Sequence, residues 1–131
     1  MRLLDANVIL RYLLKDHPAM AQAAREAVME GAETTPEVLA EVVYVLNGYY
    51  NINRQEIAGT LLSFLNEIEM AEKASVKYAL RLFAEKRLDF VDCLLAGYHH
   101  VRGREIVTFD QKLRAVLAND PFMPVASEDE H

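Results

Sequence analysis

Leu3-Leu4-Asp5-Ala6-Asn7 is the stretch around which the predicted fold is organised. A short apolar run stops at a carboxylate and then passes, through Asn7 as the expected N-cap, into helix-patterned sequence. This order places Asp5 at the carboxyl end of a strand. Because ligands of open α/β sheets bind at that edge, the stretch predicts the position of a site as well as a strand.

Three further acids occupy comparable junctions or borders: Glu41 in a helix that starts near Pro36, Asp92 in Leu88-Asp89-Phe90-Val91-Asp92, and Asp110 in Val107-Thr108-Phe109-Asp110. Carboxylates gathered at one sheet edge repel one another unless a cation binds them. Oxygen ligands suit Mg²⁺ and Mn²⁺, which activate water for attack on phosphates. The sequence therefore predicts an ion held by Asp5, Glu41, Asp92 and Asp110, with Asp5 as both the catalytic centre and a source of strain.

Some of these acids also have plain structural explanations. Glu41 borders the buried face of its helix, where an edge glutamate can reach solvent past its own stem. Acids at a helix cap and three residues further on are favoured by the helix N-terminus without any chemistry. We interpret Asp89 as such a cap and Asp92 as a metal ligand. Asn7 and Thr108 are candidates to hydrogen-bond a carboxylate or phosphate oxygen.

The four acids resemble the acidic set of PIN-domain nucleases, in particular the VapC-like toxins of prokaryotic type II toxin–antitoxin pairs. Their contexts here are L-D-A-N, an early helix, D-x-x-D-C-L-L-A and V-T-F-D. The likeness covers the chain from Met1 to about Val125. Each motif consists of a few common residues, so the specificity comes from the order and spacing of all four.

The resemblance implies an endoribonuclease that depends on Mg²⁺ or Mn²⁺, with RNA as substrate, a cognate antitoxin protein as partner and a homodimer as the assembly. The residue pattern points to an interface as well. Tyr44, Tyr49 and Tyr50 lie beyond the core stripe of their helix, and Leu62 lies off the buried face of the next helix. Together they predict an apolar patch larger than a small monomer exposes.

Length and composition indicate one globular domain. The chain has 131 residues, of which 52% are hydrophobic and 26% charged. We expect a single domain over residues 1–126 and a disordered acidic tail over 127–131. The apolar runs are shorter than a membrane span and the N-terminus lacks a signal-peptide pattern, so we expect a soluble cytoplasmic protein. The single cysteine, Cys93, is predicted to be a small core residue.

Short strands alternate with helical segments along the whole chain. This alternation predicts an α/β fold, a three-layer α/β/α sandwich with a parallel sheet of about five strands; the resemblance implies the same. The strands are expected at residues 3–4, 33–34, 68–70, 105–108 and 123–125. Of these, 105–108 reads as buried, since Glu105-Ile106-Val107-Thr108 is a mainly β-favouring run that leads into Asp110.

Charge is unevenly distributed. A net charge of −6 argues against a nucleic-acid partner, but residues 73–114 hold nine of the fourteen basic residues and only five acids. Lys73, Lys77 and Arg81 recur every four residues on one helix. Such a row either follows a phosphate backbone or is a solvated face, and we favour the second reading.

Other chemical classes find little support. The chain has no Gly-rich phosphate loop, no paired Cys/His zinc spacing and no G-x-S-x-G elbow. A receiver-like or phosphatase-like protein would show paired aspartates at the first strand and a lysine at a late strand end, and neither is present. Two alternatives stay open: a PIN-like nuclease of RNA processing outside any toxin–antitoxin pair, and a catalytically silent PIN-like interaction domain.

Overall fold

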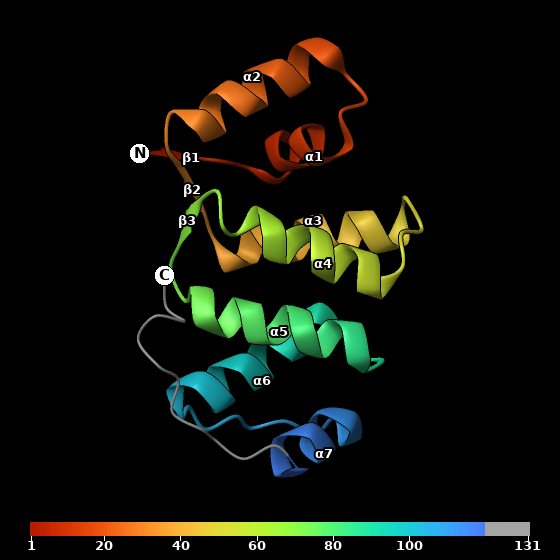
Figure 1. Cartoon of the computed structure of the whole chain (residues 1–131). Helices are drawn as coiled ribbons and strands as arrows, with labels where there is room; N and C mark the ends of the chain where they lie inside the picture. The colour runs from red at the N-terminus through yellow and green to blue at the C-terminus, as the bar shows by residue number, and fades with distance from the viewer. Residues whose placement is uncertain (120–131) are drawn as a thin grey trace.

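The computed structural model describes residues 1–119 and shows seven helices around a small parallel sheet (Figure 1). The strands are β1 (Arg2–Leu3), β2 (Ala32–Thr34) and β3 (Glu69–Met70), paired in the order β1-β2-β3. The helices are α1 (Ala6–Leu14), α2 (Pro18–Met29), α3 (Pro36–Gly48), α4 (Arg54–Phe64), α5 (Lys73–Glu85), α6 (Phe90–Arg102) and α7 (Gln111–Asn119). The predicted α/β class with a parallel sheet is thus confirmed.

The end of β1 is tied closely to the central strand β2. The Leu4 amide donates to the Glu33 carbonyl at 2.8 Å, which extends the pairing one residue beyond β1. The buried Thr34 hydroxyl donates to the Leu4 carbonyl at 3.0 Å. Both groups of Leu4 are therefore satisfied within the sheet, as a buried backbone requires. This fixes the backbone immediately before Asp5.

Polar caps begin several helices, and one of them differs from the prediction. Asn7 was the expected cap of the first helix, but α1 is capped by Asp5, whose side chain accepts from the Val8 amide at 2.9 Å. Aspartate caps as well as asparagine, and the chain leaves the sheet directly before Asp5, so the helix begins earlier. At the start of α4, Asn53 and Glu56 have the spacing of a capping box, and the Asn53 side chain accepts from the Glu56 amide at 2.8 Å.

The prediction of a buried strand at 105–108 is wrong. Val107 is 85% exposed and Phe109 is 86% exposed, and the segment joins no strand. The connection from α6 to α7 runs beside these two helices, at the opposite end of the view from β1 (Figure 1). Residues 1–119 therefore contain three strands where about five were expected. The predicted strand at 123–125 and the tail at 127–131 lie outside the described residues.

Side-chain contacts at both ends explain the course of this segment. The His99 ring contacts the Arg104 carbonyl oxygen through Nδ1 at 2.8 Å, and Arg114 Nε donates to the Thr108 carbonyl at 2.8 Å. Both carbonyls thus have hydrogen-bond partners on α6 and α7, so they do not need a neighbouring strand to be satisfied. Within residues 1–119, β1 consequently pairs with β2 alone and has one open edge.

Cys93 lies in the core on α6 with no accessible surface, as the sequence predicted. Burial, the main cause, raises the pKa of its thiol to about 12. We expect the folded protein to react with a thiol reagent at pH 8 far more slowly than the urea-unfolded chain, because the thiolate is the reactive form. A colorimetric thiol assay on both states measures this. Fast stoichiometric labelling of the folded protein would contradict a buried Cys93.

No helix within residues 1–119 is long and apolar enough to cross a membrane.

Candidate functional site

Two of the predicted site residues interact electrostatically. Asp92 lies half-buried in the first turn of α6. Burial raises the pKa of its carboxyl, and the negative charges of Asp110 and then Asp89 raise it further. Asp89 occupies the N-cap position of α6, as predicted, although its side chain makes no capping hydrogen bond. Asp92 and Asp110 therefore form an acidic pair, with Asp89 beside it.

Asp110 is held at the start of α7 by local hydrogen bonds. Its Oδ1 accepts from the Leu113 amide at 2.8 Å, and its own amide donates to the Thr108 hydroxyl at 3.1 Å. Leu113 is fully buried and anchors α7 to the core. Thr108 was predicted to bind a carboxylate or phosphate oxygen; in this structure its hydroxyl binds the backbone of Asp110.

Asp5 and Glu41 are placed elsewhere. Asp5 follows β1, is exposed and uses one carboxylate oxygen to cap α1. Glu41 is exposed on α3, and Asn7 is exposed in the first turn of α1. Since β1 and α7 lie at opposite ends of the view in Figure 1, the elements that carry Asp5 and Asp110 are far apart.

The four acids do not converge in this arrangement. Among residues 1–119, no group of three or more Asp, Glu, His or Cys side chains is close enough to hold a metal ion. The physical reason is the position of the segment before α7, which stays with α6 and α7 and does not extend the sheet next to β1. The structure thus brings Asp92 and Asp110 together and leaves Asp5 and Glu41 outside that pair.

The model of the PIN domain family matches residues 2–118, a span that includes all four acids. The chain belongs to the PIN domain family. PIN domains have a nuclease-type fold, and the family is generally one of metal-dependent nucleases. No curated protein and no solved structure matches the chain.

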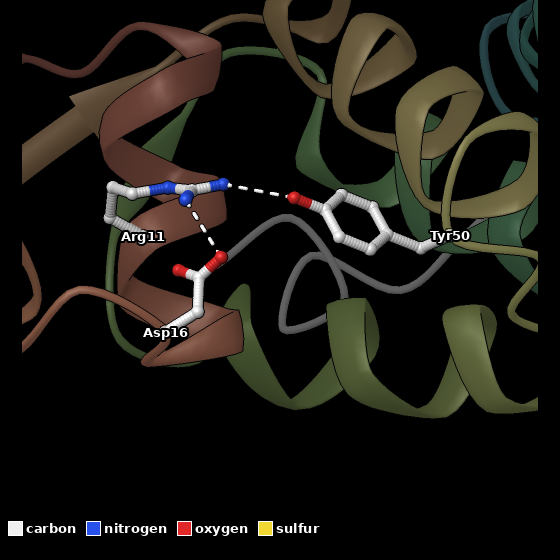
Figure 2. Close-up of polar contacts among 3 residues, drawn as sticks. All are labelled: Arg11, Asp16 and Tyr50. Carbon is white, nitrogen blue, oxygen red and sulfur yellow. Dashed lines mark hydrogen bonds and ion pairs between the residues drawn. The ribbon is translucent and has the colours of Figure 1, made fainter.

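Arg11 is a residue of this PIN domain that the sequence analysis missed. Its guanidinium donates to the Asp16 carboxylate at 2.8 Å and to the Tyr50 hydroxyl at 3.3 Å (Figure 2). The side chain is only 12% exposed. It joins α1 to the connections that follow α1 and α3, and so orients the helix that Asp5 caps. The available signal was a single arginine within the apolar run Ile9-Leu10-Arg11-Tyr12-Leu13-Leu14.

Proposed function

We propose that this PIN domain is an endoribonuclease that uses Mg²⁺ or Mn²⁺ and acts as the toxin of a toxin–antitoxin pair. The observation that carries the proposal is the family match over residues 2–118, which spans Asp5, Glu41, Asp92 and Asp110. The acidic pair of Asp92 and Asp110 supports it, because a half-buried carboxylate beside a second one favours a cation or a proton.

The arrangement of residues 1–119 does not fit an ion held by three or more side chains. Binding of the metal by the full set of four acids therefore remains a prediction. The chain's own groups can still be assigned roles toward RNA. The N-termini of α6 and α7 carry partial positive charge next to Asp92 and Asp110. They offset part of the repulsion between these carboxylates and an approaching phosphodiester.

RNA cleavage with and without divalent cation tests the proposal. The parent is expected to cut RNA in Mg²⁺ or Mn²⁺ and to lose the activity in excess EDTA. Asp5→Asn is expected to cut at least roughly 100-fold more slowly, since it removes a ligand charge while asparagine still caps α1. Asp89→Asn serves as the matched control and is expected to keep the activity. Cleavage that persists in EDTA, or in Asp5→Asn at the parent rate, contradicts the proposal.

A silent interaction domain is the second candidate, and one observation favours it: no three acids among the described residues are placed so that they could hold a metal ion. It predicts no cleavage by any variant in any metal. A nuclease of RNA processing predicts cleavage that no small partner protein inhibits. The same assay, with and without a protein encoded next to this one, separates the three readings.

The antitoxin is proposed to inhibit by laying an amphipathic helix or an extended tail over the acidic site and offering an arginine to the carboxylates. A guanidinium can bind two carboxylate oxygens in a forked geometry and so compete with a metal ion. Replacing every arginine of that partner with glutamine is expected to remove inhibition, measured as restored RNA cleavage. Full inhibition by the arginine-free partner rules this mode out.

We also propose that the protein forms a homodimer through Tyr44 and Tyr49. Tyr44 lies on α3 and Tyr49 lies at the C-terminal end of α3, and both are largely exposed. The predicted patch is smaller than expected, because Tyr50 and Leu62 are half-buried against the core. Light scattering at tens of micromolar protein should give about twice the 14.9 kDa chain mass. The double variant Tyr44→Ser, Tyr49→Ser should give one chain mass. A parent mass near 14.9 kDa would remove the dimer.

A further inference from the structure

The basic row predicted on α5 is not a continuous surface. Lys73 is 5% exposed; its ammonium group donates to the Ile68 carbonyl at 2.8 Å and lies 3.8 Å from the Glu69 carboxylate. This lysine anchors the turn between β3 and α5, so it is neither a phosphate ligand nor part of a solvated face. Lys73 therefore offers no positive charge to a ligand, and other basic residues of the C-terminal half have to supply it.

One group of basic side chains surrounds a groove between the end of α5 and α7. The groove has a volume of about 570 Å³ and is lined by Lys86, Arg87 and Lys112, with Glu85 as its one acidic residue among the described residues. Apolar side chains of α5 and α7 form other parts of the lining. An open groove with an excess of positive charge suits an extended anionic chain.

An exposed aromatic ring lies near the other side of α7. Phe109 is 86% exposed, and the Arg114 guanidinium carbon is 5.9 Å from the centre of its ring. Arg114 is held in place by its hydrogen bond to the Thr108 carbonyl. A flat apolar ring in water, with a guanidinium beside it, offers the two kinds of surface on which an unpaired base stacks.

Both features include residues of α7, the helix that begins after Asp110. Lys112 and Arg114 are two positions apart on α7, so they project about 200° apart around the helix. Leu113 between them is buried against the core, and Asp110 stands at the start of the same helix, next to Asp92. A chain that follows α7 can thus reach Phe109, the carboxylate at the start of the helix and the basic groove.

We propose that this surface binds one strand of RNA, with a base stacked on Phe109 and backbone phosphates held by Lys86, Arg87 and Lys112. The bound strand places a phosphodiester at the acidic pair of Asp92 and Asp110. The inference rests on the proposed ribonuclease function for its choice of ligand. A duplex is excluded, because its bases are already stacked and cannot reach Phe109.

Binding of a fluorescently labelled single-stranded RNA tests the proposed binding surface. Fluorescence anisotropy measures this binding in EDTA, where the RNA is not cleaved. Phe109→Ala is expected to weaken binding roughly 5- to 100-fold, and Phe109→Trp to retain it, since stacking requires an aromatic ring. Phe109→Leu keeps an apolar side chain and is expected to bind as weakly as alanine. The double variant Arg87→Glu, Lys112→Glu is expected to weaken binding and reduce its dependence on salt concentration.

Matched controls come from α2. Met29 is 79% exposed and apolar, and Arg25 is exposed and basic, so Met29→Ala and Arg25→Glu should bind like the parent. Equal binding by Phe109→Ala and Met29→Ala, parent-like binding by Phe109→Leu, or duplex RNA bound as tightly as single strands would each overturn the inference. Far-ultraviolet circular dichroism of each variant confirms that it is folded.

The experiment separates this inference from the nuclease proposal. If RNA binding depends on Phe109 but the protein does not cleave RNA in Mg²⁺, the nuclease proposal is contradicted and the binding surface stands. If the parent cleaves RNA but none of the substitutions on the proposed binding surface changes RNA binding, the binding surface is contradicted and the nuclease proposal stands.

Discussion

Asp92→Asn is expected to reduce RNA cleavage by at least roughly 100-fold while raising the melting temperature of the metal-free protein at pH 7. Asp92 is half-buried, and its ionised form is disfavoured by burial, by Asp110 and by Asp89, in that order. Asparagine keeps the shape and removes the charge. Activity and stability should therefore change in opposite directions, as expected for a strained functional group.

The pH dependence follows from the direction of the pKa shift. The pKa of Asp92 in the folded protein is raised above the value of 3.8 that an ordinary aspartate has. Between these two values the folded protein binds more protons than the unfolded chain, so stability falls as pH rises through that window. Above the raised pKa of Asp92, the loss of stability no longer changes with pH. The gain from Asp92→Asn is thus complete at neutral pH and disappears as pH falls below the ordinary aspartate value.

Thermal melts of both proteins in EDTA, from pH 7 down to about pH 3, measure this gain. Glu41→Gln is the control; Glu41 is exposed, so removing its charge should leave the melting temperature close to that of the parent. A melting temperature of Asp92→Asn equal to or below that of the parent at pH 7 would show that the Asp92 charge carries no strain. The sequence had assigned this strain to Asp5, which is exposed and caps a helix.

Periodicity and capping patterns were sufficient for most helices. On α3 the apolar spacing predicts a buried face of Val38, Leu39, Val42, Val45, Leu46 and Tyr49. Leu39, Val42 and Leu46 are buried and Val38 and Val45 are partly buried, but Tyr49 is 77% exposed. The predicted strand at 105–108 is absent for a physical reason: a β-favouring run does not specify which strand it will pair with. Here the His99 and Arg114 side chains satisfy backbone carbonyls of the segment locally, so the β pattern has no neighbouring strand to pair with.

The candidate site was predictable to a similar degree. An acid after an apolar run and an acid at a helix start are both visible in sequence, and this placed Asp5, Asp92 and Asp110 at element ends. Whether these ends meet depends on how the segment before α7 packs, and a local sequence pattern does not specify that packing. The contact of Arg114 with Phe109 likewise depends on that packing.

Gly97→Ala is expected to destabilise the protein by roughly 1–3 kcal/mol or more, because it overpacks the contact between α5 and α6. A Cβ built on Gly97 would lie 2.4 Å from the carbonyl oxygen of Ser75. That oxygen belongs to the α5 backbone and cannot rotate away, so one helix has to shift. Since α6 carries Asp92 in its first turn, the shift should also slow RNA cleavage.

Gly59→Ala is the matched control for this substitution. Gly59 lies on α4 with nothing within 4 Å of a built Cβ, so alanine meets no obstacle and is the better helix former. We expect it to stabilise the protein by roughly 0.4–1 kcal/mol and to leave cleavage unchanged. Urea unfolding of the three proteins gives both free-energy changes. If Gly97→Ala unfolds at the same urea concentration as Gly59→Ala, the close approach of α5 and α6 does not limit the packing of the helix that carries Asp92.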